Sequence, residues 1–158
     1  MKNEFLKSFT MLLLVVVLAL AAAAVSANAQ ASHLVVADIP FEFSVGYKIL
    51  PAGQYTVKAL SADSRALLIQ SADQNVSVLR LSDPIERAKD NSVARLVFHV
   101  YGQRYFLAEV WDGADKTGRL MLKSQEERTI EDELASLSPQ SDAAKSTYET
   151  IEVVARLR

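Results

Sequence analysis

Short β-rich runs separated by turn residues dominate the chain and restrict its fold more than any other feature. The runs 41–45 and 55–59 alternate apolar and polar residues, which is the period of a strand with one buried face. Turn residues separate such runs at intervals of about 8–12 positions. Strands do not alternate with helices, so a parallel sheet is not expected. The pattern predicts an all-β, mainly antiparallel fold, either a β-sandwich or an open barrel of about eight short strands.

The segment 93–111 carries the clearest hairpin signal. Two β-rich runs flank Gly102 and Gln103, and a glycine at the first central position suits a two-residue primed turn. In a regular register, Glu109 lies on the opposite face of the hairpin from His99. Apolar residues occupy both faces. Either the hairpin is covered on both sides, or a bulge shifts its register by one residue.

Two further runs, Ala66–Ser71 and 76–81, predict another hairpin, because residues that favour turns lie between them. Asp83 and Pro84 are expected to end this pair of strands. The polar segment 85–92 shows no clear period, so a loop or a single helical turn is expected there.

One helix is well marked near the C-terminus. Ser124 starts a capping box, in which the side chain of Glu127 is expected to reach back to the serine. Apolar residues between 130 and 137 recur at helical spacing and form one amphipathic stripe. Pro139 is expected to stop the helix.

The N-terminus has the layout of a secretory signal. Lys2 and Lys7 precede fifteen consecutive apolar residues at 11–25, and small residues follow. We expect cleavage between Ala29 and Gln30. The apolar run is shorter than the roughly 20 residues of a spanning helix, although an uncleaved anchor is an alternative. The prediction is an exported protein, periplasmic or extracellular, with no membrane span after cleavage.

Three regions follow from these patterns. Residues 1–29 form the signal peptide, and 30–138 form the β-sandwich-like domain. Residues 139–158 form a polar linker that is followed by a final strand or a disordered tail. The alternation of apolar and polar residues over 151–157 favours the strand.

Composition excludes several classes of protein. The formal net charge is −2, which is not the basic balance of a nucleic-acid binder. Half of the residues are apolar, too many for a disordered chain. The chain has no cysteine, and this excludes disulfides, cysteine–metal sites and a thiol nucleophile.

Several motifs in order resemble a known group of proteins. IPFEFSVG at 39–46 leads into LPAG-x-Y at 50–55, and FHVYG at 98–102 precedes YFL at 105–107. Together they resemble a group of small exported bacterial hypothetical proteins. The resemblance covers about 39–127 and implies an exported β-domain. It implies no activity and no functional residues.

The aromatic hairpin supplies the candidate ligand-binding residues His99, Tyr101, Arg104 and Trp111. Tyrosine, tryptophan and arginine concentrate at binding hot spots, and exposed rings could stack on sugars or anchor a partner protein. The alternative is that the rings form a core and cross-strand pairs. His99 could act as a general base only with a positioned partner.

The remaining motifs do not indicate a catalytic, metal or cofactor site. The only other histidine, His33, lies close to the predicted cleavage site, and we expect no catalytic constellation, metal or cofactor. The predicted function is a non-enzymatic binding or envelope-associated structural module with a protein or glycan partner. The alternatives are a small exported hydrolase that uses His99 and a carbohydrate-binding module that uses the aromatic hairpin.

Overall fold

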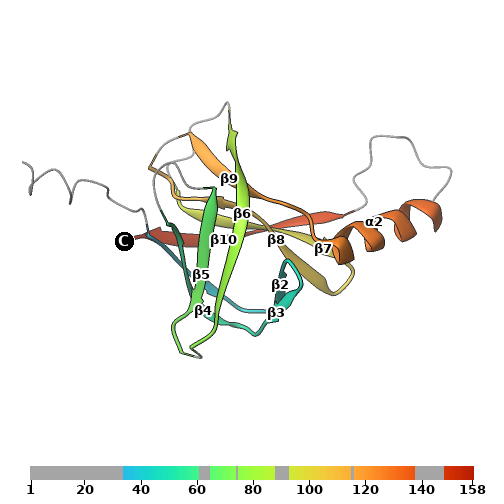
Figure 1. The fold of residues 1–158 in the computed structure, drawn as a ribbon, viewed down its shortest axis with the longest axis horizontal. Helices are drawn as coiled ribbons and strands as arrows, with labels where there is room; N and C mark the ends of the chain where they lie inside the picture. Colours follow the sequence, from blue (N-terminus) through green and yellow to red (C-terminus); the bar gives the residue numbers. More distant parts are fainter. Residues whose placement is uncertain (1–33, 61–64, 74, 88–92, 115, 138–147) are drawn as a thin grey trace, which may run out of the picture. The chain divides into compact units, whose positions relative to one another are not determined.

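The computed structural model describes residues 34–60, 65–73, 75–87, 93–114, 116–137 and 148–158. These residues form ten strands and one helix (Figure 1). His33 and the expected cleavage residues Ala29 and Gln30 lie outside the described residues. In chain order the elements are β1 (Leu34–Ile39), β2 (Phe43–Val45), β3 (Lys48–Leu50), β4 (Gly53–Ala59), β5 (Ala66–Ser71), β6 (Ser77–Glu86), β7 (Arg95–Tyr101), β8 (Arg104–Trp111), β9 (Thr117–Met121), α2 (Gln125–Leu137) and β10 (Glu149–Leu157).

Eight of the strands form a closed antiparallel barrel. Their order is β8-β7-β10-β1-β4-β5-β6-β9, and a pairing between β9 and β8 closes the ring. The other half of β8 pairs in parallel with β2 through Phe106 and Ser44, so the β2–β3 hairpin is attached outside the ring. The predicted all-β, mainly antiparallel class with one C-terminal helix is confirmed.

Alternate residues of the strands fill the barrel with apolar side chains. An eight-stranded barrel has an interior just wide enough for side chains. Phe43 makes edge-to-face contacts with Tyr55 and Phe98, with ring centroids 5.0 and 5.5 Å apart. The core also contains Val35, Ala37, Ile39, Val57, Leu67, Ile69, Leu96 and Leu107.

The predicted hairpin at Gly102 and Gln103 is confirmed, and β7 pairs with β8. Gly102 has φ of 65°, as a primed turn requires at its first central position. A bulge lies further along, because Val97 pairs with Glu109 and Phe98 with Leu107. The bulge occurs together with burial of β7 on both faces, so both features considered for this hairpin are present. The shifted register brings Glu109 to the face that carries His99, and not to the opposite face as expected.

Other strands differ from the sequence-based expectations. β1 and β3 were not expected, and β6 continues past Asp83 and Pro84 to pair with β9. Proline is tolerated there because the pairing of β6 with β5 ends at Leu81, which leaves Pro84 with a neighbour on one side. β10 lies between β7 and β1. The strand alternative is therefore correct for the C-terminal segment, and the barrel continues beyond Ser138 to Leu157.

The helix α2 lies next to the tip of the β7–β8 hairpin (Figure 1). It ends at Leu137, just before Pro139 as predicted. Its Ile130 and Leu134 are half-buried and do not belong to the barrel core. Within the described ranges, no helix combines the length and hydropathy that crossing a membrane requires.

Candidate functional site

The outer face of the β7–β8 hairpin carries two polar clusters. We call them the His–Glu cluster, made of His99, Tyr101, Lys123, Glu127, Glu131 and Tyr148, and the Arg–Trp cluster, made of Arg87, Arg95, Glu109, Trp111 and Glu152. The sequence-predicted residues divide between them. His99 and Tyr101 belong to the first cluster, and Trp111 belongs to the second.

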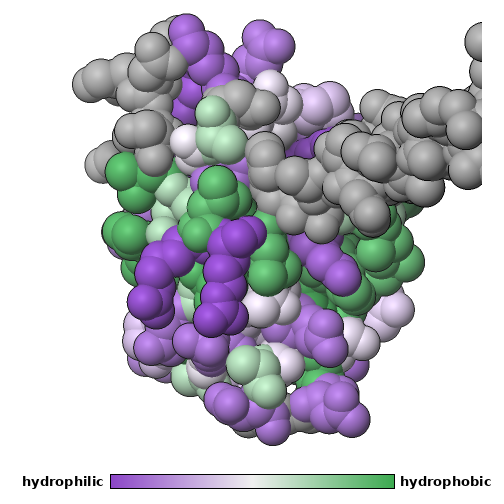
Figure 2. All heavy atoms as spheres, turned by 90° about the vertical axis from the view of Figure 1, so that its left-hand side faces the viewer, coloured by the Kyte–Doolittle hydropathy of each residue, from purple (hydrophilic) through white to green (hydrophobic). Residues whose placement is uncertain are grey.

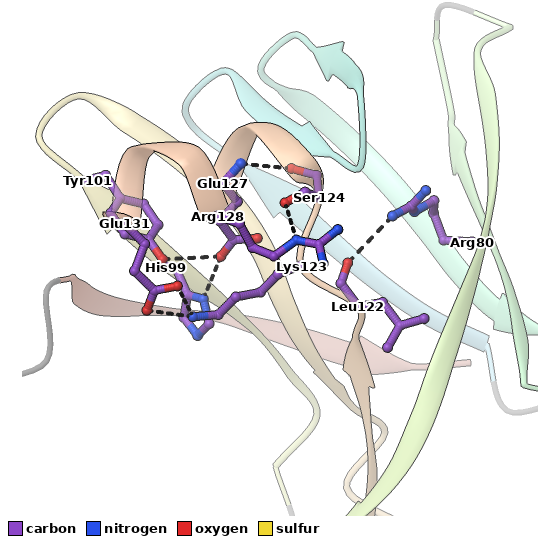
Figure 3. Close-up of polar contacts among 9 residues, drawn as sticks. All are labelled: Arg80, His99, Tyr101, Leu122, Lys123, Ser124, Glu127, Arg128 and Glu131. Carbon is purple, nitrogen blue, oxygen red and sulfur yellow. Dashed lines mark hydrogen bonds and ion pairs between the residues drawn. The ribbon is translucent and has the colours of Figure 1, made fainter. Parts of the chain in front are cut away.

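The His–Glu cluster joins the barrel to the first turn of α2 (Figure 3). His99 Nδ1 lies 2.8 Å from Glu127 Oε1, and both side chains are buried. The hydroxyl of Tyr101 donates to the same carboxylate oxygen at 3.4 Å. Glu127 thus supplies the positioned carboxylate that the sequence did not identify for His99, but it does so inside a covered contact between two elements.

Tyr148 covers the imidazole. Its ring centroid lies 4.0 Å from that of His99 and 5.5 Å from that of Tyr101. Lys123 Nζ lies 4.9 Å from the Tyr148 ring centroid and donates to both carboxylate oxygens of Glu131 at 2.7 and 2.8 Å. The Tyr148 ring therefore covers the cluster, and the polar side chains of the cluster bond to one another.

The electrostatic environment of Tyr101 is strongly negative. Burial raises the pKa of its phenol well above the ordinary value of 10.0, and the charges of Glu127 and Glu131 raise it further. A phenol in these surroundings keeps its proton and acts as a hydrogen-bond donor. Tyr101 thus stabilises the Glu127 carboxylate beside His99.

The capping box forms only in part. The backbone N–H of Glu127 donates to Ser124 Oγ at 3.0 Å, as predicted for an N-cap. The expectation that the Glu127 side chain returns to the serine was wrong, because this carboxylate binds His99 and Tyr101.

Arg104 lies apart from both buried clusters. Its guanidinium forms an ion pair with Glu126, and both side chains are partly exposed. Such a pair contributes little to stability in solvent. This ion pair joins the tip of the hairpin to α2. Arg104 does not belong to either cluster with His99 or Trp111.

The Arg–Trp cluster is built on the indole of Trp111. The guanidinium carbons of Arg87 and Arg95 lie 4.8 and 5.4 Å from the ring centroid, a distance typical of cation–π contacts. The indole N–H donates to Glu109 at 2.7 Å. Arg87 donates to the same carboxylate at 3.2 Å.

Gly118 of β9 lies directly against the indole. A Cβ at this position would come within 2.6 Å of two Trp111 ring atoms. The ring is therefore fixed between β9 and the two arginines.

The predicted aromatic platform does not form at these rings. Tyr101 is 5 % exposed and Trp111 is 4 % exposed, so neither presents a face on which a sugar could stack. The buried alternative, in which the rings make cross-strand and core contacts, agrees with their positions. Among the described residues, no group of three or more acidic or histidine side chains could hold a metal ion.

The key partners were missed because they are distant in the sequence. Glu127 is 28 residues from His99, and its local context indicates only a helix cap. Arg95 begins an apolar strand, and a charge at such a position signals that partners must come from other elements. Tyr148 stands just before β10 in a segment for which a tail was one alternative.

No protein-family model, curated protein or solved structure matches the chain. The resemblance to small exported bacterial proteins stays a prediction.

Proposed function

We propose that the protein is an exported, non-enzymatic module that binds a partner protein of the cell envelope through the outer face of β5 and β6. The observation that carries the proposal is a group of outward-facing leucines on this part of the barrel wall. The His–Glu cluster on the β7–β8 hairpin, by contrast, is engaged in contacts within the chain.

The leucine face consists of Ala66, Leu68, Leu79 and Leu81. Leu67 and Ile69 of β5 point into the core, so Ala66 and Leu68 point outward. Leu68 pairs directly with Leu79, and Ala66 pairs with Leu81, which places all four residues on one surface.

These leucines are unusually accessible. Leu79 is 57 % exposed and Leu81 is 59 % exposed. Figure 2 shows hydrophobic side chains at the left edge, in the middle and at the right edge of the face in view, with hydrophilic ones between them. Contiguous exposed apolar surface with a polar rim is typical of a protein interaction site.

Charges at the rim indicate the chemistry of the partner. Lys58 of β4 pairs directly with Leu68, and Lys48 Nζ lies 3.5 Å from the carbonyl of Ser77 at the start of β6. At the other end of the face Asp83 is paired with Arg65, so the uncompensated charge of the margin comes from the two lysines, which complement acidic residues beside an apolar surface. We therefore favour a protein partner over a glycan.

Support for a non-enzymatic role comes from His99. A general base must reach the proton that it abstracts, but the imidazole of His99 is buried beneath Tyr148 and bonded to Glu127. Support for export is the apolar run at 11–25 followed by the Ala-x-Ala site.

Export is tested by fractionation. We expect the protein in the periplasm or medium of an exporting bacterium to begin at Gln30, as measured by N-terminal sequencing. An intact Met1 in the membrane fraction would support the anchor alternative, and retention in the cytoplasm would contradict export.

Binding is tested by site-specific cross-linking from position 81 during growth, followed by binding of the purified partner in vitro. The double variant Leu79→Ser/Leu81→Ser is expected to weaken binding at least about tenfold while leaving stability within about 0.5 kcal/mol of wild type. The control is Val154→Ser on β10, which removes an even more exposed apolar residue from another strand. Equal binding by wild type and the double variant, or cross-links only between copies of this chain, would contradict the proposal.

A further inference from the structure

Arg95 is a buried cation with unused hydrogen-bonding capacity. It lies on the outer face of β7, opposite Trp111, and is 3 % exposed. Its Nε and Nη2 atoms are buried and have no hydrogen-bond partner. Two nitrogen atoms of the Arg95 guanidinium are therefore buried and donate no hydrogen bond.

The surrounding carboxylates are mostly engaged elsewhere. Glu109 accepts from Trp111 at 2.7 Å and from Arg87 at 3.2 Å. Glu152 lies 3.5 Å from Arg95 Nε, outside hydrogen-bonding geometry, and 3.6 Å from Arg87 Nη1. Arg95 thus shares one distant carboxylate with Arg87.

This arrangement is energetically incomplete. A buried charge is costly unless it is paired and hydrogen-bonded. The fork of an arginine is best satisfied by two oxygens of one carboxylate or phosphate. Nearly all buried polar groups in native proteins have partners, so an orphaned pair of donors indicates that an acceptor is missing.

We propose that Arg95 and Arg87 form a binding site for a small oxyanion, a carboxylate or a phosphate group, beside Trp111. The inference goes beyond the proposed function, because none of these residues belongs to the leucine face.

The route to the site passes the more exposed members of the cluster. The side chains of Arg87 and Glu152 are 37 % and 50 % exposed, so Glu152 can swing into solvent when the anion takes its place. Trp111 stays fixed by Gly118 and Glu109. The oxyanion takes the place of Glu152, a distant acceptor, and offers two oxygen atoms to Arg95.

Trp111 is the only tryptophan in the chain, so its emission reports on this site alone. The purified protein is titrated with sodium phosphate, sodium acetate and sodium chloride at matched ionic strength. We expect a saturable change in emission with phosphate or acetate and none with chloride, and the lower Kd identifies the preferred group. At ten times that Kd, the melting temperature should rise by about 4 °C.

Three variants distinguish an oxyanion-binding site from an ion-pair network that binds no ligand. Arg95→Met should abolish the response, and the exposed Arg104→Gln should retain it. Glu152→Gln removes the internal competitor and should lower the Kd about fivefold, equivalent to about 1 kcal/mol. A wild-type protein without a saturable oxyanion response, or a Glu152→Gln variant with weakened binding, would overturn the proposal. The wild-type titration decides even if Arg95→Met fails to fold.

Discussion

The two polar clusters on the β7–β8 hairpin share one face but satisfy their charges differently. In the His–Glu cluster, the imidazole of His99 and the phenol of Tyr101 meet the same carboxylate of Glu127, and Lys123 is bonded to Glu131. In the Arg–Trp cluster, Arg95 has two buried donors without an acceptor. A histidine in a strand with a buried carboxylate partner is therefore structural here, whereas an arginine without one points to a ligand.

The two clusters also play different roles in the fold. The His–Glu cluster attaches α2 to the barrel, because Glu127 lies in the first turn of the helix. The Arg–Trp cluster takes its side chains from β7, β8, β10 and the residue after β6, and it packs the indole of Trp111 against Gly118 of β9. Substitutions can therefore disturb one cluster and leave the other in place.

A large effect is expected from Gly118→Ala, which breaks the Arg–Trp cluster alone. The new Cβ would lie 2.6 Å from two ring atoms of Trp111, so the indole must move or the strand must shift. Overpacking of this kind costs about 2–3 kcal/mol. Chemical denaturation should show this loss, together with a shift in Trp111 emission.

The matched control for that substitution is Gly102→Ala at the hairpin tip. No heavy atom lies within 4 Å of a Cβ there, but φ is 65°. The cost should be about 1 kcal/mol from backbone strain, with Trp111 emission unchanged. Equal costs for the two variants would contradict the tight contact between Gly118 and the indole.

A smaller effect is expected from Tyr101→Phe, which affects only the His–Glu cluster. At neutral pH the lost hydrogen bond should cost about 1 kcal/mol. The pKa of Tyr101 is raised in the folded state, so the folded protein holds this proton more tightly than the unfolded chain. The corresponding stability is present below the ordinary pKa of 10.0 and is lost as the pH rises above it.

The alkaline loss of stability should therefore be shallower in Tyr101→Phe than in wild type. Denaturation midpoints measured between neutral pH and about pH 11 test this. Identical slopes for the two proteins would show that burial and the Glu127 charge do not raise the pKa of Tyr101 in the folded state.

The sequence predicted the local features of the hairpin and the helix well. The turn at Gly102 and the N-cap at Ser124 depend on residues adjacent in the chain, and both are present. The bulge near Ala108 could not be placed, because both faces of the hairpin are apolar and hydrophobic patterning then does not distinguish registers. That bulge decides which face carries Glu109 and Trp111.

The candidate site was less predictable than the fold because its contacts are long-range. The sequence identified His99 and Trp111 as unusual, but not the partners that bury them. Glu127 and Glu152 come from α2 and β10, and only the closed barrel brings them to the hairpin. The leucines of β5 and β6 were recognised as strand residues, but the sequence did not show which of them face outward.

The difference in hydrogen bonding between the two clusters is tested most directly by removing one buried hydrogen-bonding side chain from each. The measurement is the free energy of unfolding of Arg95→Met and His99→Phe in chloride buffer without other anions. We predict that Arg95→Met stays within about 1 kcal/mol of wild type, because an apolar side chain replaces an incompletely paired charge. His99→Phe should lose about 3 kcal/mol, because it leaves Glu127 buried without its main partner. A loss for Arg95→Met as large as that for His99→Phe would contradict the account.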